Sequence, residues 1–111
     1  MRVCPKKEHV YQANYTDEEI NMLCKKALDK WGYLSQILMC IEEFSELMQV
    51  LVKSNRKVNC STREEIASEM ADVYLMLKQM QIAFGINDIT IASIEEEKLD
   101  RLKKLLEMPT K

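Results

Sequence analysis

Glycine and proline are scarce in this chain, since each occurs only twice among 111 residues. A sheet protein needs many tight turns, which usually contain these residues, so the composition disfavours sheets and favours a few long helices. No apolar run approaches the roughly 18 residues of a membrane-spanning helix, so no membrane partner is expected. The first residues also lack the apolar stretch of a signal peptide.

Histidine is almost absent as well, because His9 is the only one. The Glu-x-x-His pairs of ferritin-like di-iron sites are therefore excluded, and the chain has no Gly-rich phosphate loop. The net charge is −2, and basic residues alternate with acidic ones. This distribution argues against a nucleic acid duplex as the partner, because such binding depends on phosphate neutralisation. A free nucleotide is not excluded as a partner, since a metal ion can carry the positive charge that its phosphates need.

The four cysteines are spread along the sequence at Cys4, Cys24, Cys40 and Cys60. They form no Cys-x-x-Cys pair, which argues against a zinc ribbon. Cys24 and Cys40 fall within helical patterns and are interpreted as small core residues. Four free thiols fit a reducing, cytoplasmic setting.

Hydrophobic periodicity predicts four helices, over residues 17–30, 33–54, 62–84 and 89–107. Three of them have candidate N-caps, which are Thr16 for the first, Ser61 or Thr62 for the third, and Asn87 or Asp88 for the fourth. The links are short, so neighbouring helices should run antiparallel. The expected fold class is all-α, as a four-helix up-and-down bundle.

The chain is long enough for one domain. Residues 1–15 show no clear period and are interpreted as a loose N-terminal arm. Residues 16–108 then form a single helical domain. A domain of this size buries only about two-thirds of its unfolded surface, so oligomerisation would stabilise it.

The predicted helix over residues 33–54 is apolar around much of its circumference. Its strongest stripe is interpreted as the face toward the core, and consists of Leu34, Ile37, Leu38, Ile41, Phe44, Met48, Leu51 and Val52. Met39, Leu47 and Val50 lie off this stripe. A helix of this kind is usually buried on more than one side. We therefore expect a second subunit to cover it, in a homodimer or a dimer of dimers.

Acidic residues gather in the middle of two neighbouring predicted helices. Glu42, Glu43 and Glu46 share a stripe of the second helix, and Glu69 and Asp72 share a face of the third. Like charges at these spacings repel, and no basic residue of the second helix stands one turn away. If the helices face each other, the carboxylates could form an all-oxygen cage that suits Mg²⁺ or Mn²⁺. The alternative is two solvated acidic faces without a metal, although methionines beside the acids favour partial burial.

These acids resemble a known family pattern. Glu42-Glu43-x-x-Glu46, followed on the next helix by Glu69-x-x-Asp72, is similar to the motif of the MazG-like all-α nucleoside triphosphate pyrophosphohydrolases. The similarity to small stand-alone members extends over about residues 17–105. It includes Trp31-Gly32, Gln36, Lys53, Ala71-Asp72-Val73 and Lys98-Leu99-x-Arg101-Leu102.

The resemblance implies an enzyme that cleaves a nucleoside triphosphate to a monophosphate and pyrophosphate, with Mg²⁺ as the cofactor and Mn²⁺ as a possible substitute. Glu43, Glu46, Glu69 and Asp72 would bind the metal. Glu42 would complete the catalytic set as an additional acid, near a further metal, a water or the residues around them. The ions would grip the phosphates and activate a water.

Four further residues are candidates for substrate binding: Trp31, Lys53, Lys98 and Arg101. The basic residues could contact phosphates, and Trp31 could stack on a base. Ordinary surface charge for the three basic residues and an interface anchor for Trp31 are the alternatives. For the whole chain, the alternative function is a non-catalytic helical interaction or nucleotide-binding module.

Overall fold

The computed structural model describes residues 14–109, and all regular structure in this range is helical. The helices are α1 (Asp17–Trp31), α2 (Tyr33–Lys53), α3 (Arg63–Phe84) and α4 (Asp88–Glu107). Their bounds agree with the predicted ones to within one residue, so the prediction of an all-helical chain with four helices is confirmed. Most of the predicted arm lies outside the described residues. None of the described helices combines the length and the apolar character that crossing a bilayer requires.

Local chemistry sets the helix ends. Thr16 and Thr62 both form capping boxes, in which each hydroxyl accepts a backbone N–H three residues on at 3.1 Å. Asn87 caps α4 by accepting a backbone N–H at 2.8 Å. Gly85 ends α3 in the left-handed conformation, with φ at 65°. Gly32 joins α1 to α2 with φ at 88° and ψ at 151°, a conformation that is essentially restricted to glycine.

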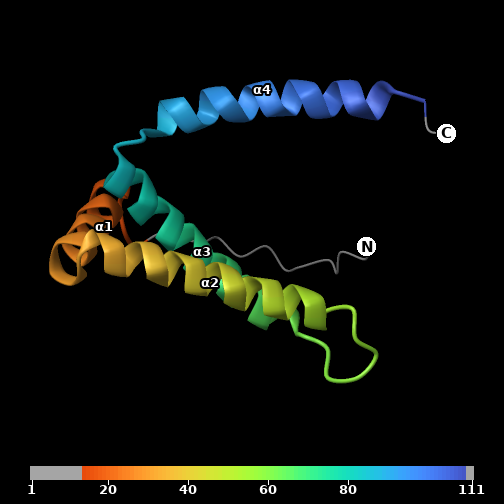
Figure 1. Cartoon of the computed structure of the whole chain (residues 1–111), viewed down its shortest axis with the longest axis horizontal. Helices are drawn as coiled ribbons and strands as arrows, with labels where there is room; N and C mark the ends of the chain where they lie inside the picture. The colour runs from red at the N-terminus through yellow and green to blue at the C-terminus, as the bar shows by residue number, and fades with distance from the viewer. Residues whose placement is uncertain (1–13, 110–111) are drawn as a thin grey trace.

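Three of the helices pack together. α2 and α3 lie side by side and antiparallel, and α1 contacts both of them (Figure 1). The buried side chains of the described residues all lie in these three helices: Cys24, Leu28, Gln36, Cys40, Val73 and Met76. Cys24 and Cys40 are free and buried, which confirms their interpretation as core residues.

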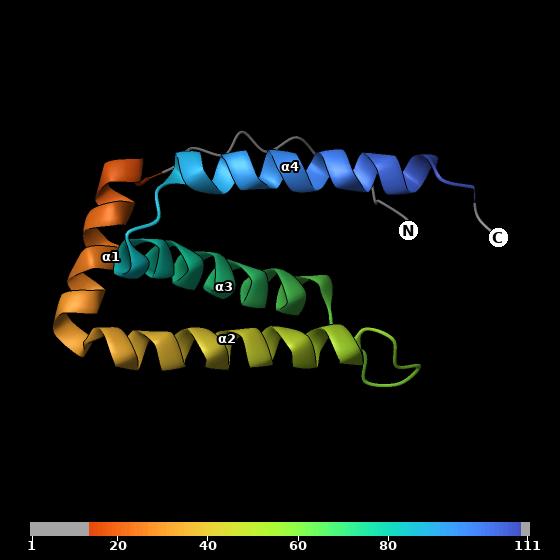
Figure 2. The ribbon, with the colours of Figure 1, turned by 45° about the horizontal axis from the view of Figure 1, so that its top comes forward.

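α4 stands apart from the other three helices (Figure 2). Within residues 14–109, it has no buried side chain and no close backbone approach to α1, α2 or α3. The radius of gyration is 17.7 Å, whereas a compact chain of this length has about 13 Å. Residues 14–109 therefore form four helices, of which only three pack against each other.

The face of α2 that packs on α3 differs from the predicted core stripe. Five residues of that stripe are exposed over more than half of their surface, namely Leu34, Leu38, Ile41, Met48 and Val52. The best-buried positions of α2 instead fall on another stripe, at Gln36, Cys40, Glu43, Leu47 and Val50. Both stripes repeat at helical spacing, so periodicity alone did not distinguish the inner face from the outer one.

A hydrogen bond between two amides joins α2 to α3. Gln36 is only 5% exposed, and its Nε2 donates to Oε1 of Gln79 at 2.7 Å. Glu43 lies seven residues after Gln36 on α2, and Asp72 lies seven residues before Gln79 on α3. Because the two helices are antiparallel, the register that pairs the two amides also places these two acids opposite each other.

Replacing Gln36 by Ala should lower the free energy of unfolding by about 1–3 kcal/mol, because the amide of Gln79 loses its partner in a partly buried position. Urea denaturation measures this change. Gln49→Ala, an exposed position on the same helix, should change the value by less than about 0.5 kcal/mol. Equal losses in the two variants would contradict a specific role for the amide pair.

Candidate metal centre

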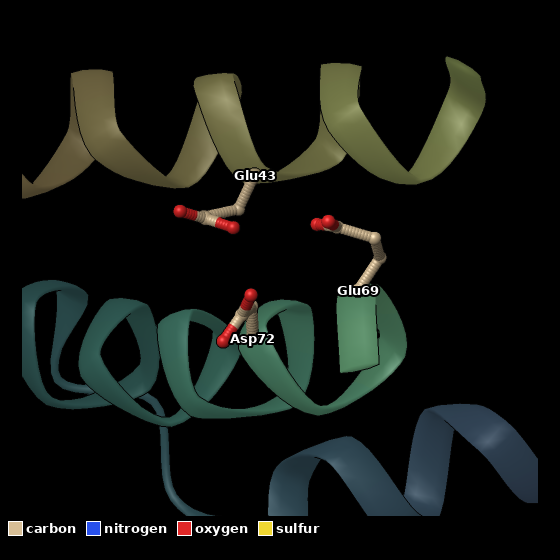
Figure 3. A group of neighbouring side chains, drawn as sticks. All are labelled: Glu43, Glu69 and Asp72. Atoms are coloured by element: carbon tan, nitrogen blue, oxygen red, sulfur yellow. The ribbon is translucent and has the colours of Figure 1, made fainter. Parts of the chain in front are cut away.

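Acidic side chains of α2 and α3 meet between the two helices. Glu43 comes from α2, and Glu69 and Asp72 come from neighbouring turns of α3. One carboxylate oxygen of each lies within 4.8 Å of the other two. Figure 3 shows the three carboxylates pointing into the same space between the helices. A set of ligand atoms made only of oxygen is the kind that hard divalent cations prefer.

Two of these carboxylates hold an oxygen without a partner. Oε2 of Glu43 and Oε2 of Glu69 are buried and accept no hydrogen bond from the described residues. Both side chains are half-buried, whereas Asp72 is exposed. Removing a charged oxygen from water without a partner is costly. A cation is the partner that would satisfy both oxygens at once, so these residues fit a metal site.

Burial also changes the acidity of the cluster. Desolvation is the main cause that raises the pKa of Glu43 and Glu69 above the ordinary value, and repulsion by Glu46 and Asp72 raises it further. None of the causes is a neighbouring positive charge. The cluster therefore concentrates negative charge that no basic side chain of the described residues offsets.

Three of the five predicted acids converge. Glu46 is exposed, but it lies near enough to repel both Glu43 and Glu69. Glu42 is exposed and lies about 100° around the helix from Glu43, outside the cluster. The predicted partial burial is correct for Glu69 but wrong for Asp72, whose carboxylate stays open to solvent.

Trp31 and Lys53 lie near opposite ends of α2. Trp31 ends α1, two residues before α2 begins at Tyr33, and Tyr33 precedes Glu43 by about 15 Å along α2. Lys53 follows Glu43 by about 15 Å. Trp31 is 58% exposed, and Nζ of Lys30 lies 5.4 Å from the centroid of its ring. The chain does not bring either residue to the acidic cluster.

Lys98 and Arg101 lie on α4, away from the acids. With Ile94 and Glu97 they line a shallow hollow on the surface of that helix. Within the described residues, α4 meets α3 at its first residue, where Oδ1 of Asp88 accepts a hydrogen bond from Nε2 of Gln81 at 2.9 Å. The backbone of α4 comes close to none of the other described helices, so neither basic side chain reaches the cluster within one chain.

Gln79 was not among the residues predicted from the sequence. A pattern in the sequence could have indicated it, since each helix has a glutamine seven residues from an acid of the cluster, Gln36 before Glu43 and Gln79 after Asp72. An amide at the corresponding position of each helix indicates that the two positions face each other. Gln79 holds Gln36 and so helps to position the acids without belonging to the cluster.

Comparison with known proteins identifies no relative, because no family model, no curated protein and no solved structure matches the chain. The fold and the site therefore define the protein by class alone. It is an all-helical protein with a carboxylate cluster between two antiparallel helices.

Without divalent cations, the protein should lose stability as the pH rises above about 4.5, the ordinary pKa of a glutamate. The folded pKa of Glu43 is raised, so its proton stabilises the fold below that pH, and this stabilisation is lost as the pH rises through the folded value. Urea denaturation in a chelating buffer at several pH values measures the loss.

Glu43→Gln should reduce this loss and raise the free energy of unfolding at neutral pH, since the amide cannot ionise. Glu42→Gln is the matched control, because Glu42 is exposed and outside the cluster. It should keep the wild-type dependence on pH. An unchanged dependence in Glu43→Gln would show that burial of this carboxyl does not affect stability.

Proposed function

We propose that this chain is a Mg²⁺-dependent nucleotide pyrophosphohydrolase of the MazG-like type, which cleaves a nucleoside triphosphate to a monophosphate and pyrophosphate. One observation carries the proposal. The acids of the Glu-Glu-x-x-Glu and Glu-x-x-Asp patterns, represented by Glu43, Glu69 and Asp72, converge with ligand oxygens within 4.8 Å. Two independent solvated faces would have no reason to bring these carboxylates together.

Glu43, Glu69 and Asp72 would hold the metal, with Glu46 beside them. The two buried oxygens without hydrogen-bond partners support this assignment. When bound, Mg²⁺ would neutralise charge on the phosphates, lower the pKa of a water and stabilise the leaving pyrophosphate. Mn²⁺ prefers similar ligands and is the expected substitute.

Hydrolysis also needs a group that accepts a proton from the attacking water. The water oxygen bonds to phosphorus, the P–O bond to the pyrophosphate breaks, and the proton passes to a carboxylate. A carboxylate of the acidic set that is not engaged by the metal suits this role. Glu46, beside the cluster, and Glu42, one residue before Glu43, are the candidates.

Positive groups for the phosphates would come from outside the α2–α3 pair. Lys53, Lys98 and Arg101 remain the candidates, and Trp31 remains the candidate for stacking on a base. Because the backbone of α4 comes close to none of the other described helices, Lys98 and Arg101 could approach a cluster after assembly. The proposal therefore includes a homodimer or a dimer of dimers.

Pyrophosphate release from a panel of common, deoxy and damaged nucleoside triphosphates tests the activity. Wild type should release pyrophosphate with Mg²⁺ or Mn²⁺, and Asp72→Asn and Glu46→Gln should each lower the rate by about 100-fold or more, as loss of transition-state stabilisation does in other active sites. Glu64→Gln, in the exposed first turn of α3, is the control and should keep the wild-type rate.

The results distinguish a wrong activity from a wrong assignment of the catalytic residues. No release by wild type would exclude the enzyme for this panel and favour the non-catalytic module. Full activity in both Asp72→Asn and Glu46→Gln would leave the activity standing but show that the assigned acids do not perform it.

A further inference from the structure

Positive charge gathers around the loop between α2 and α3. No acid occurs between Glu46 and Glu64, although the whole chain contains 18 acidic residues. The same segment contains four basic residues, which are Lys53, Arg56, Lys57 and Arg63. Acids and bases alternate along much of the chain, but the positive charge of this segment has no acid within it to offset it.

Two of these basic residues line an open hollow at the end of α2 that leads into the loop (Figure 2). The volume of the hollow is about 420 Å³, and ligand pockets usually have about 300–1,000 Å³. The lining consists of Ser45, Met48, Gln49, Val52, Lys53 and Arg56. It contains two positive charges, an amide, a hydroxyl and no acid, so its polar groups suit phosphate oxygens.

The backbone turns at the end of α2 and keeps Arg56 at this hollow. The N–H of Asn55 donates to the carbonyl of Val52 at 3.3 Å, and the N–H of Arg56 donates to the carbonyl of Lys53 at 3.1 Å. Lys53 also compensates the dipole at the C-terminus of α2. Arg56 lies beyond the helix, and the next residue, Lys57, does not line the hollow.

The hollow begins beside the acidic cluster. Ser45 lines it and directly precedes Glu46, whose charge raises the pKa of two acids of the cluster. Glu46, Gln49 and Lys53 follow one another in steps of three and four, so they share one stripe of α2. Lys53 lies about 10 Å from Glu46 along the helix. The hollow therefore extends from the edge of the cluster to two basic side chains.

Only one direction along α2 offers positive charge. From Tyr33 to Val52 the helix contains no basic residue. A phosphate chain that is held at the cluster and extends along α2 therefore meets basic groups only toward Lys53 and Arg56. Of the two products of the proposed reaction, pyrophosphate is the more highly charged, and it gains charge as the bond breaks.

We propose that this hollow binds the leaving pyrophosphate, with Lys53 and Arg56 contacting its oxygens and Gln49 as a further donor. The inference rests on the proposed function, because it assigns a place to one product of that reaction. When the P–O bond breaks, the electron pair stays on the oxygen of the pyrophosphate. Basic groups near that product stabilise the charge that develops there.

Calorimetric titration of the full chain with inorganic pyrophosphate in the presence of Mg²⁺ tests the site without any turnover. Wild type should bind pyrophosphate. Lys53→Gln and Arg56→Gln should each weaken the binding by about 10-fold, because each removes a charged contact. Lys57→Gln is the matched control, since it removes the same charge from a residue outside the hollow. It should stay within about twofold of wild type.

Titration with a nucleoside monophosphate tests which end of the substrate the hollow takes. Arg56→Gln should bind the monophosphate as wild type does, because this product lacks the leaving group. A larger loss of affinity for the monophosphate than for pyrophosphate would place the nucleoside end in the hollow and overturn the proposal.

A wild type that binds no pyrophosphate, or equal losses in Arg56→Gln and Lys57→Gln, would overturn it as well. The proposed function can fail separately. Pyrophosphate binding that depends on Arg56, in a protein that cleaves no nucleotide of the panel, would support the site and exclude the reaction. Cleavage by wild type, together with unchanged pyrophosphate binding in Arg56→Gln, would support the reaction and exclude the site.

Discussion

The register between α2 and α3 is the constraint on which the rest of the structure depends. The hydrogen bond from Gln36 to Gln79, at 2.7 Å, fixes the relative position of the two helices. The same antiparallel register sets Glu43 opposite Asp72 and Glu46 opposite Glu69. A slip of either helix by one turn moves a side chain by about 5.4 Å, which exceeds the 4.8 Å that spans the ligand oxygens. The cluster therefore exists only in this register.

The cluster also explains why so much apolar surface is left outside. The inner face of α2 holds an amide and a carboxylate, at Gln36 and Glu43, where a helix of a simple bundle would hold apolar side chains. Polar and like-charged side chains on this packed face lower the stability of the fold. Functional sites often contain such unfavourable arrangements, because their function requires them. The exposed apolar residues lie instead on the outer face of α2 and on α4, including Leu34, Ile41 and Met48 on α2.

The sequence predicted the helices because caps and periodicity are local. Thr16, Thr62 and Asn87 set helix starts through contacts within one turn. It also predicted the meeting of Glu43 with Glu69 and Asp72, because spacing places acids on one face of each helix. The inner face of α2 was mistaken because two stripes compete and hydrophobicity favours the outer one. The separation of α4 from the other helices was not predicted, because periodicity indicates the length and the faces of a helix but not its direction relative to its neighbours.

The binding of a divalent cation by the acidic cluster is the central claim, and a Mn²⁺ titration followed by electron paramagnetic resonance tests it most directly. Binding removes the signal of the free ion. Wild type should bind Mn²⁺, Mg²⁺ should displace it, and Glu69→Gln should leave the ion free, while Glu64→Gln binds as wild type does. A wild-type protein that leaves Mn²⁺ free, or Glu69→Gln that binds it equally well, would contradict the assignment of the metal centre.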